Sequence, residues 1–79
     1  MEDFNKVKAY INGQLRNGDV KAIVSKAGKT QPVFASAMRK DIWASLTDSE
    51  KKVITKAVQY LKQRETKEAK ALENISNSL

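Results

Sequence analysis

The sequence predicts an all-α protein of four helices, in which the second and third are short and the last is long. Apolar residues recur at helical spacings through most of the 79 residues. The residues that break helices are few, and the three glycines and the single proline all lie in the first half of the chain. No residue beyond Thr47 forces a helix to stop, so we expect one continuous helix there.

The first helix is expected to begin near Asp3 or Asn5, because either side chain can accept hydrogen bonds from free backbone amides. Asn17, Gly18 and Asp19 then form a turn signal, and Asp19 is placed to cap the next helix. Apolar residues at helical spacings form the inward face of the first helix: Phe4, Val7, Tyr10, Ile11 and, if the helix continues past Gly13, Leu15.

The second and third helices are separated by a three-residue turn. Gly28 can adopt the left-handed conformation that ends a helix, and Thr30 can cap the next helix with Pro32 in its first turn. The spacings predict buried residues in the second helix at Val20, Ile23, Val24 and Ala27. They predict an inward face of the third helix at Phe34, Ala37 and Met38, and outward side chains at Gln31, Val33, Ser36, Arg39 and Lys40.

The second half of the chain is expected to be a short connection followed by the fourth helix. Residues 41–46 fit either a final helical turn or an extended connection, and the sequence does not decide between them. Thr47 and Glu50 form a capping box, which predicts a helix start. The core stripe of this helix is predicted at Val53, Ile54, Ala57, Val58 and Leu61. We therefore divide the chain into a domain over residues 1–61 and a helical extension over 62–79.

The composition argues against an enzyme and favours a polyanionic partner. The chain has no Cys and no His, which removes the side chains that most often hold metals or act as nucleophile and base. We expect no catalytic residue, metal, cofactor or small-molecule ligand. Fifteen Lys and Arg against nine Asp and Glu give a formal charge of +6. Six basic residues and one acid lie between Arg16 and Lys40, so the positive charge is concentrated around the two short helices.

The chain also shows no signal for a membrane or for export. It contains no run of about 20 apolar residues, which is the length that a membrane-spanning helix requires. Glu2 and Asp3 stand where a leader would carry basic residues followed by an apolar segment. We expect a cytoplasmic protein without a membrane partner. The Lys and Arg of residues 62–79 are interpreted as a solvated helix face.

The layout of residues 20–39 is that of a helix-turn-helix, with a glycine in the turn and a capped second helix. Ile23, Val24 and the Ala27-Gly28 pair match the first helix and turn of lactose-repressor and lambda-repressor domains. The segment 30–34 resembles the start of their recognition helix. With the helix over 47–61, the chain is similar to small regulators of intestinal bacteria and their phages, and the resemblance covers residues 4–61.

The resemblance implies a transcriptional regulator that binds duplex DNA, and two positions depart from the family pattern. Val24 stands where the family usually has Ala, so the crossing of the two helices must absorb extra bulk. Lys29 stands where an apolar residue is usual. Either the stem of Lys29 lies along apolar surface with its amine in solvent, or the register of the match differs.

A helix in the major groove contacts base edges near its N-terminus, while neighbouring cations hold phosphates. We predict base contacts by Gln31, Val33 and Ser36, and backbone contacts by Lys29, Thr30, Arg39 and Lys40. Lys21 and Lys26 are expected to add distant electrostatic support. Trp43, Tyr10 and Tyr60 are interpreted as core or boundary residues.

Two further expectations concern partners. Leu72, Ile75 and Leu79 have no obvious partner within the chain, so residues 62–79 are predicted to contribute to a homodimer. The alternative to a DNA-binding regulator is a helical protein-interaction module, such as an anti-repressor or virion component. An architectural DNA-binding protein in recombination is a third possibility.

Overall fold

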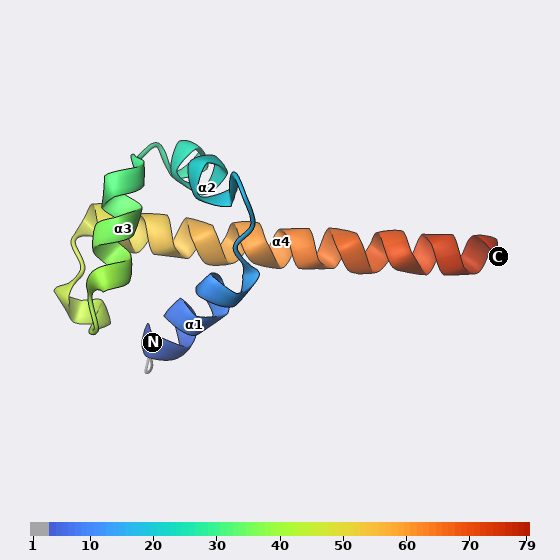
Figure 1. Cartoon of the computed structure of the whole chain (residues 1–79), viewed down its shortest axis with the longest axis horizontal. Helices are drawn as coiled ribbons and strands as arrows, with labels where there is room; N and C mark the ends of the chain where they lie inside the picture. Colours follow the sequence, from blue (N-terminus) through green and yellow to red (C-terminus); the bar gives the residue numbers. More distant parts are fainter. Residues whose placement is uncertain (1–3) are drawn as a thin grey trace.

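The computed structural model describes residues 4–79, which form four α-helices and one 3-10 turn. Figure 1 shows α1, α2 and α3 gathered around the N-terminal half of α4, whose other half projects away from them. The elements in chain order are α1 (Phe4–Gln14), α2 (Asp19–Ala27), α3 (Gln31–Arg39), η1 (Trp43–Ser45) and α4 (Asp48–Ser78). The prediction of an all-α fold with a long last helix is confirmed.

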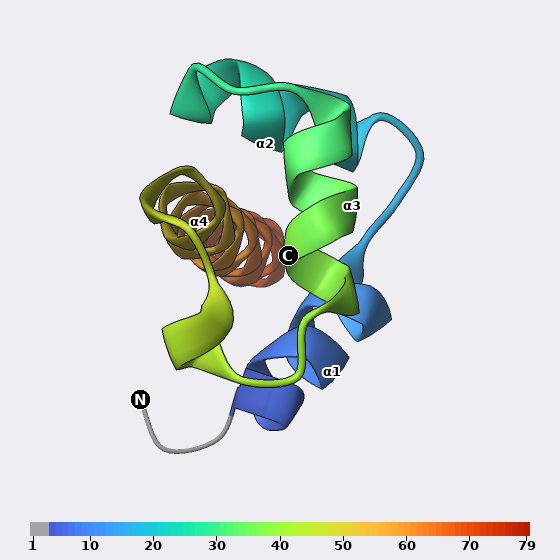
Figure 2. The same cartoon turned by 90° about the vertical axis from the view of Figure 1, so that its left-hand side faces the viewer.

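The hydrophobic core lies where the three shorter helices meet α4. In the view along α4, α2 and α3 lie on different sides of it and α1 lies below α3 (Figure 2). From α4, the buried side chains are Val53, Ile54, Ala57 and Leu61. The other elements contribute Phe4, Ile11, Ile23, Val24, Ala27, Phe34, Ala37 and Leu46. Most predicted inward residues are therefore confirmed, and Val7, Tyr10, Leu15, Val20, Met38 and Val58 lie half-buried around this core.

Gly28 ends α2 as predicted. It adopts the left-handed conformation with φ 70° and ψ 31°. The amide of Lys29 donates to the carbonyl of Val24 at 2.8 Å, which satisfies an otherwise free carbonyl at the helix end. Val24 is buried and Lys29 is half-buried, so the core accommodates the valine and the lysine side chain is partly covered.

The predicted helix starts need two corrections. Asn5 lies within the first turn of α1 rather than before it, and Asp3 lies outside the described residues. Gly18, not Asp19, is the N-cap residue of α2, with φ 85°. The Asp19 carboxylate instead accepts hydrogen bonds from the Arg16 amide at 2.7 Å and from Arg64 of α4 at 2.5 Å. These contacts draw Asp19 inward, and it joins the α1–α2 turn to α4.

The connection between α3 and α4 combines both predicted alternatives. Ile42 and Leu46 are extended, and a single 3-10 turn at Trp43–Ser45 lies between them. Trp43 packs its ring edge-on against Phe4 at a centroid distance of 5.8 Å. The capping box of Thr47 and Glu50 is confirmed by both of its hydrogen bonds. This connection therefore helps to close the core beneath α3.

The domain continues further along α4 than the predicted boundary at Leu61. Helix α4 is continuous there, and Arg16 donates to Glu68 at 2.9 Å. Tyr10 likewise donates to Glu65 at 3.0 Å. The projecting part of α4 thus begins near Glu68. Within residues 4–79, no helix has the length and apolarity needed to cross a bilayer.

Candidate nucleic-acid interface

Helix α3 is held rigidly by its inward face. Phe34 and Ala37 are buried against the core, and α3 packs on both α2 and α4. Thr30 occupies the N-cap position and Pro32 lies in the first turn, where its missing amide has no helical acceptor to lose. A short helix fixed in this way presents its opposite face in a defined orientation.

The opposite face of α3 is a narrow exposed stripe. Gln31, Ala35 and Arg39 are exposed at intervals of four residues, so they lie along one side of the helix. Pro32 is exposed beside them. Gln31 lies at the N-terminal end, where a helix placed in the major groove meets base edges. Gln31 and Arg39 therefore have the outward orientation that the sequence predicted.

Ser36 points inward, so the prediction that it faces outward is wrong. Its hydroxyl donates to the Glu50 carboxylate at 2.6 Å, and the side chain is half-buried. Val33 is also half-buried, because it packs against the hydrophobic core. The base contacts predicted for these two residues would require side chains that already have partners within the domain.

Lys40 is likewise partly engaged inside the protein. Its amine contacts Glu50 at 3.2 Å and donates to the carbonyl of Ser45 at 3.2 Å. Hydrogen bonds from Ser36 and from the Thr47 amide, together with Lys40, lower the pKa of Glu50 to about 2. Glu50 is therefore an anion at neutral pH, and it compensates much of the Lys40 charge.

Thr30 and Lys29 remain suited to phosphate contacts at the start of α3. The Thr30 hydroxyl makes no capping hydrogen bond to the helix, and the residue is exposed. Lys29 is half-buried in the turn. Among the ion pairs of residues 4–79, none involves Lys29 or Arg39. These two cations can neutralise an external anion without first breaking an ion pair.

Ala35 is the exposed residue that the sequence reasoning missed. Counting four residues on from Gln31 and four back from Arg39 gives this position, so the helical period could have identified it. Its methyl group is able to contact a thymine methyl in the major groove. The exposed stripe of α3 therefore offers an amide, a methyl group and a guanidinium in sequence.

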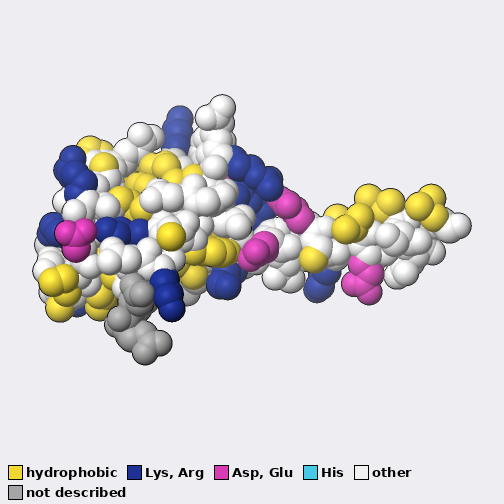
Figure 3. All heavy atoms as spheres, turned by 60° about the horizontal axis from the view of Figure 1, so that its bottom comes forward, with side chains coloured by type: hydrophobic (Ala, Val, Ile, Leu, Met, Phe, Trp, Pro, Cys, Tyr) yellow, Lys and Arg dark blue, Asp and Glu magenta, His cyan; other side chains and the backbone are white. Residues whose placement is uncertain are grey.

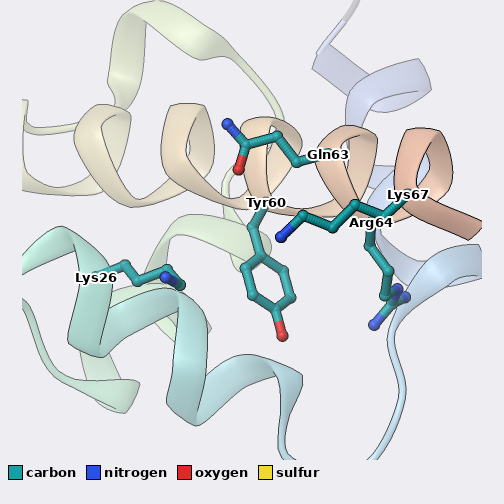
Figure 4. Close-up of a pocket in the computed structure, with 5 residues that line it drawn as sticks. All are labelled: Lys26, Tyr60, Gln63, Arg64 and Lys67. Atoms are coloured by element: carbon teal, nitrogen blue, oxygen red, sulfur yellow. The ribbon is translucent and has the colours of Figure 1, made fainter.

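Lys26, expected to support α3 from a distance, lies elsewhere. It lines a groove between α2 and α4 with Tyr60 and Gln63 (Figure 4). Arg64, which also lines this groove, donates hydrogen bonds to the Asp19 carboxylate and to the carbonyl of Gln14. Burial raises the pKa of Asp19, but hydrogen bonds from Arg64, the Arg16 amide and Tyr60 outweigh it and bring the pKa below its usual value.

No acidic cluster that could ligate a metal occurs in the described part of the chain. Searches against known protein families, curated proteins and solved structures found no match to this sequence or fold.

Proposed function

We propose that this protein binds duplex DNA sequence-specifically, as a small cytoplasmic transcriptional regulator of bacterial or phage origin. In this proposal α2 and α3 act as a helix-turn-helix, and α3 lies in the major groove. The protein acts by occupying its site and needs no cofactor. The exposed stripe of α3 is the observation that carries the proposal, because it sets polar and cationic side chains on a helix whose other face is fixed in the core.

In this proposal the residues of the stripe and of the turn before it have two separate roles. Gln31 can form two hydrogen bonds to adenine, and Ala35 can contact a thymine methyl beside it. Arg39, Lys29 and the Thr30 hydroxyl can hold phosphates, which positions α3 without reading sequence. Ser36 and Lys40 support α3 through Glu50 and have no direct contact with DNA in this proposal.

The two roles are tested by comparing Gln31→Ala with Arg39→Ala in titrations of duplexes that vary at each base position. Gln31→Ala should remove about 1–3 kcal/mol of discrimination at one position. Arg39→Ala should weaken binding to every duplex and reduce the salt slope by about 1. If both variants bind all duplexes as the parent does, α3 does not read DNA, and a protein-interaction module becomes the better explanation.

A homodimer is part of the same proposal. The projecting end of α4 exposes Leu72 and Ile75, at 66% and 60% of their full surface, together with Leu79. Their spacings of three and four residues are those of the apolar positions in a coiled coil. Figure 3 shows hydrophobic side chains along this projecting end. Pairing of two such ends would join two α3 helices and extend the DNA site beyond one half-site.

A further inference from the structure

A second cationic surface runs along α4, away from α3. Its residues recur at intervals of three or four, so they form one straight row on the helix. The row extends over about 27 Å, since each helical residue rises about 1.5 Å. No acidic residue occurs within it. We call it the lysine row, and it consists of Lys52, Lys56, Gln59, Gln63, Lys67 and Lys70.

The middle of the lysine row faces α2 across a groove. Two adjoining hollows of about 220 and 260 Å³ share Lys26, Tyr60 and Gln63 as lining residues. Arg64 and Lys67 complete the first hollow, and Lys56 and Gln59 complete the second. In Figure 4 the side chains of Lys26, Gln63 and Lys67 lie around Tyr60. A helix face that is merely solvated lacks this lining from a second helix.

The positive charge in this groove is not neutralised by the protein. None of the ion pairs within residues 4–79 involves Lys26, Lys56 or Lys67. Arg64, by contrast, is paired with Asp19, and Glu65 and Glu68 of α4 accept from Tyr10 of α1 and from Arg16 of the α1–α2 connection. The acidic side chains of this part of α4 therefore have their partners on its other side. The groove keeps three lysines without an ion pair.

We propose that the lysine row and Lys26 form a second nucleic-acid contact, which holds the phosphate backbone of one strand. A strand of duplex DNA carries one charge about every 3.4 Å, so the row is long enough for several phosphates. The amides of Gln59 and Gln63 supply neutral donors between the two pairs of lysines. No residue of α3 lines the groove. This contact adds affinity without sequence preference, and it is independent of base reading by α3.

The decisive measurement is the salt dependence of binding to a fluorescein-labelled duplex of arbitrary sequence. The test variant is Lys56→Gln with Lys67→Gln. The matched control is Lys51→Gln with Lys62→Gln, which removes the same charge from the α4 lysines that contact Trp43 and Tyr10. Circular dichroism of both variants establishes that they are folded. The slope of log Kobs against log salt should fall by about 2 for the test variant, because each lost phosphate contact contributes about 0.9.

The expected loss of affinity at 0.1 M salt is on the order of tenfold or more for the test variant, and the control slope should change by less than about 1. Equal changes of the salt slope in the two variants would show an effect of net charge alone and would overturn the proposal. An unchanged salt slope in the test variant would also overturn it. Arg39→Ala, measured in parallel, separates the two surfaces, because it should weaken binding to every duplex. If Arg39→Ala alone weakens binding, the lysine row has no role. If the test variant alone weakens binding, the lysine row holds phosphates and Arg39 of α3 does not.

Discussion

Glu50 connects three parts of the fold through one carboxylate. It completes the capping box of α4, accepts the Ser36 hydroxyl of α3 and pairs with Lys40. A single residue near the start of α4 thereby fixes both the beginning of that helix and the rotation of α3. The exposed stripe from Gln31 to Arg39 points outward because Ser36 is held on the other side of the helix.

The stability that Glu50 provides is expected to depend on pH. Its pKa in the folded protein is about 2, below its ordinary value of 4.5. A lowered pKa means that the contribution is fully present above about pH 4.5 and is lost as the pH falls toward 2. Urea unfolding of the parent and of Glu50→Gln should therefore show a difference in stability at pH 7 that narrows by pH 3.

Glu73→Gln is the control for this series, because Glu73 is exposed on the projecting end of α4. Its unfolding midpoint should follow that of the parent at each pH. If the free energies of unfolding of the parent and of Glu50→Gln differ by the same amount at pH 3 as at pH 7, the carboxylate charge of Glu50 does not stabilise the fold.

Among the elements, the end of α2 and the start of α4 were more predictable than the rotation of α3. Gly28 and the Thr47–Glu50 pair act through neighbouring backbone groups, so their chemistry is visible in a few consecutive residues. The inward position of Ser36 depends on Glu50, fourteen residues away in the chain. Asp19 was assigned to the wrong partner for the same reason, since Arg64 is 45 residues distant. The outward face of α3 was therefore predicted correctly at Gln31 and Arg39 and wrongly at Ser36.

The capping box makes a prediction about α4 as a helix. Thr47→Ala removes the hydroxyl that accepts from the Glu50 amide, and it should lower the free energy of unfolding by about 1 kcal/mol. Thr55→Ala is the matched control, because Thr55 is exposed in the interior of α4 and Ala is the better helix former. Urea unfolding measures both. Equal stability of Thr47→Ala and the parent would mean that the cap does not support the helix.

At the scale of the whole molecule, the projecting end of α4 sets the expected assembly. Leu72→Gln with Ile75→Gln leaves the Arg16–Glu68 contact and the core in place while removing the apolar pairing surface. Analytical ultracentrifugation should show a dimer for the parent and a monomer for this variant. An unchanged equilibrium between monomer and dimer would show that the projecting end of α4 does not mediate dimerisation.

In the proposed complex, Gln31 and Ala35 on the exposed stripe of α3 read base pairs. Selection from a random pool of duplexes at near-physiological salt tests it most directly. The parent should recover one sequence motif, and Gln31→Ala should lose preference at one position of that motif while retaining the others. Recovery of unrelated sequences by the parent, with no position enriched, would contradict the claim.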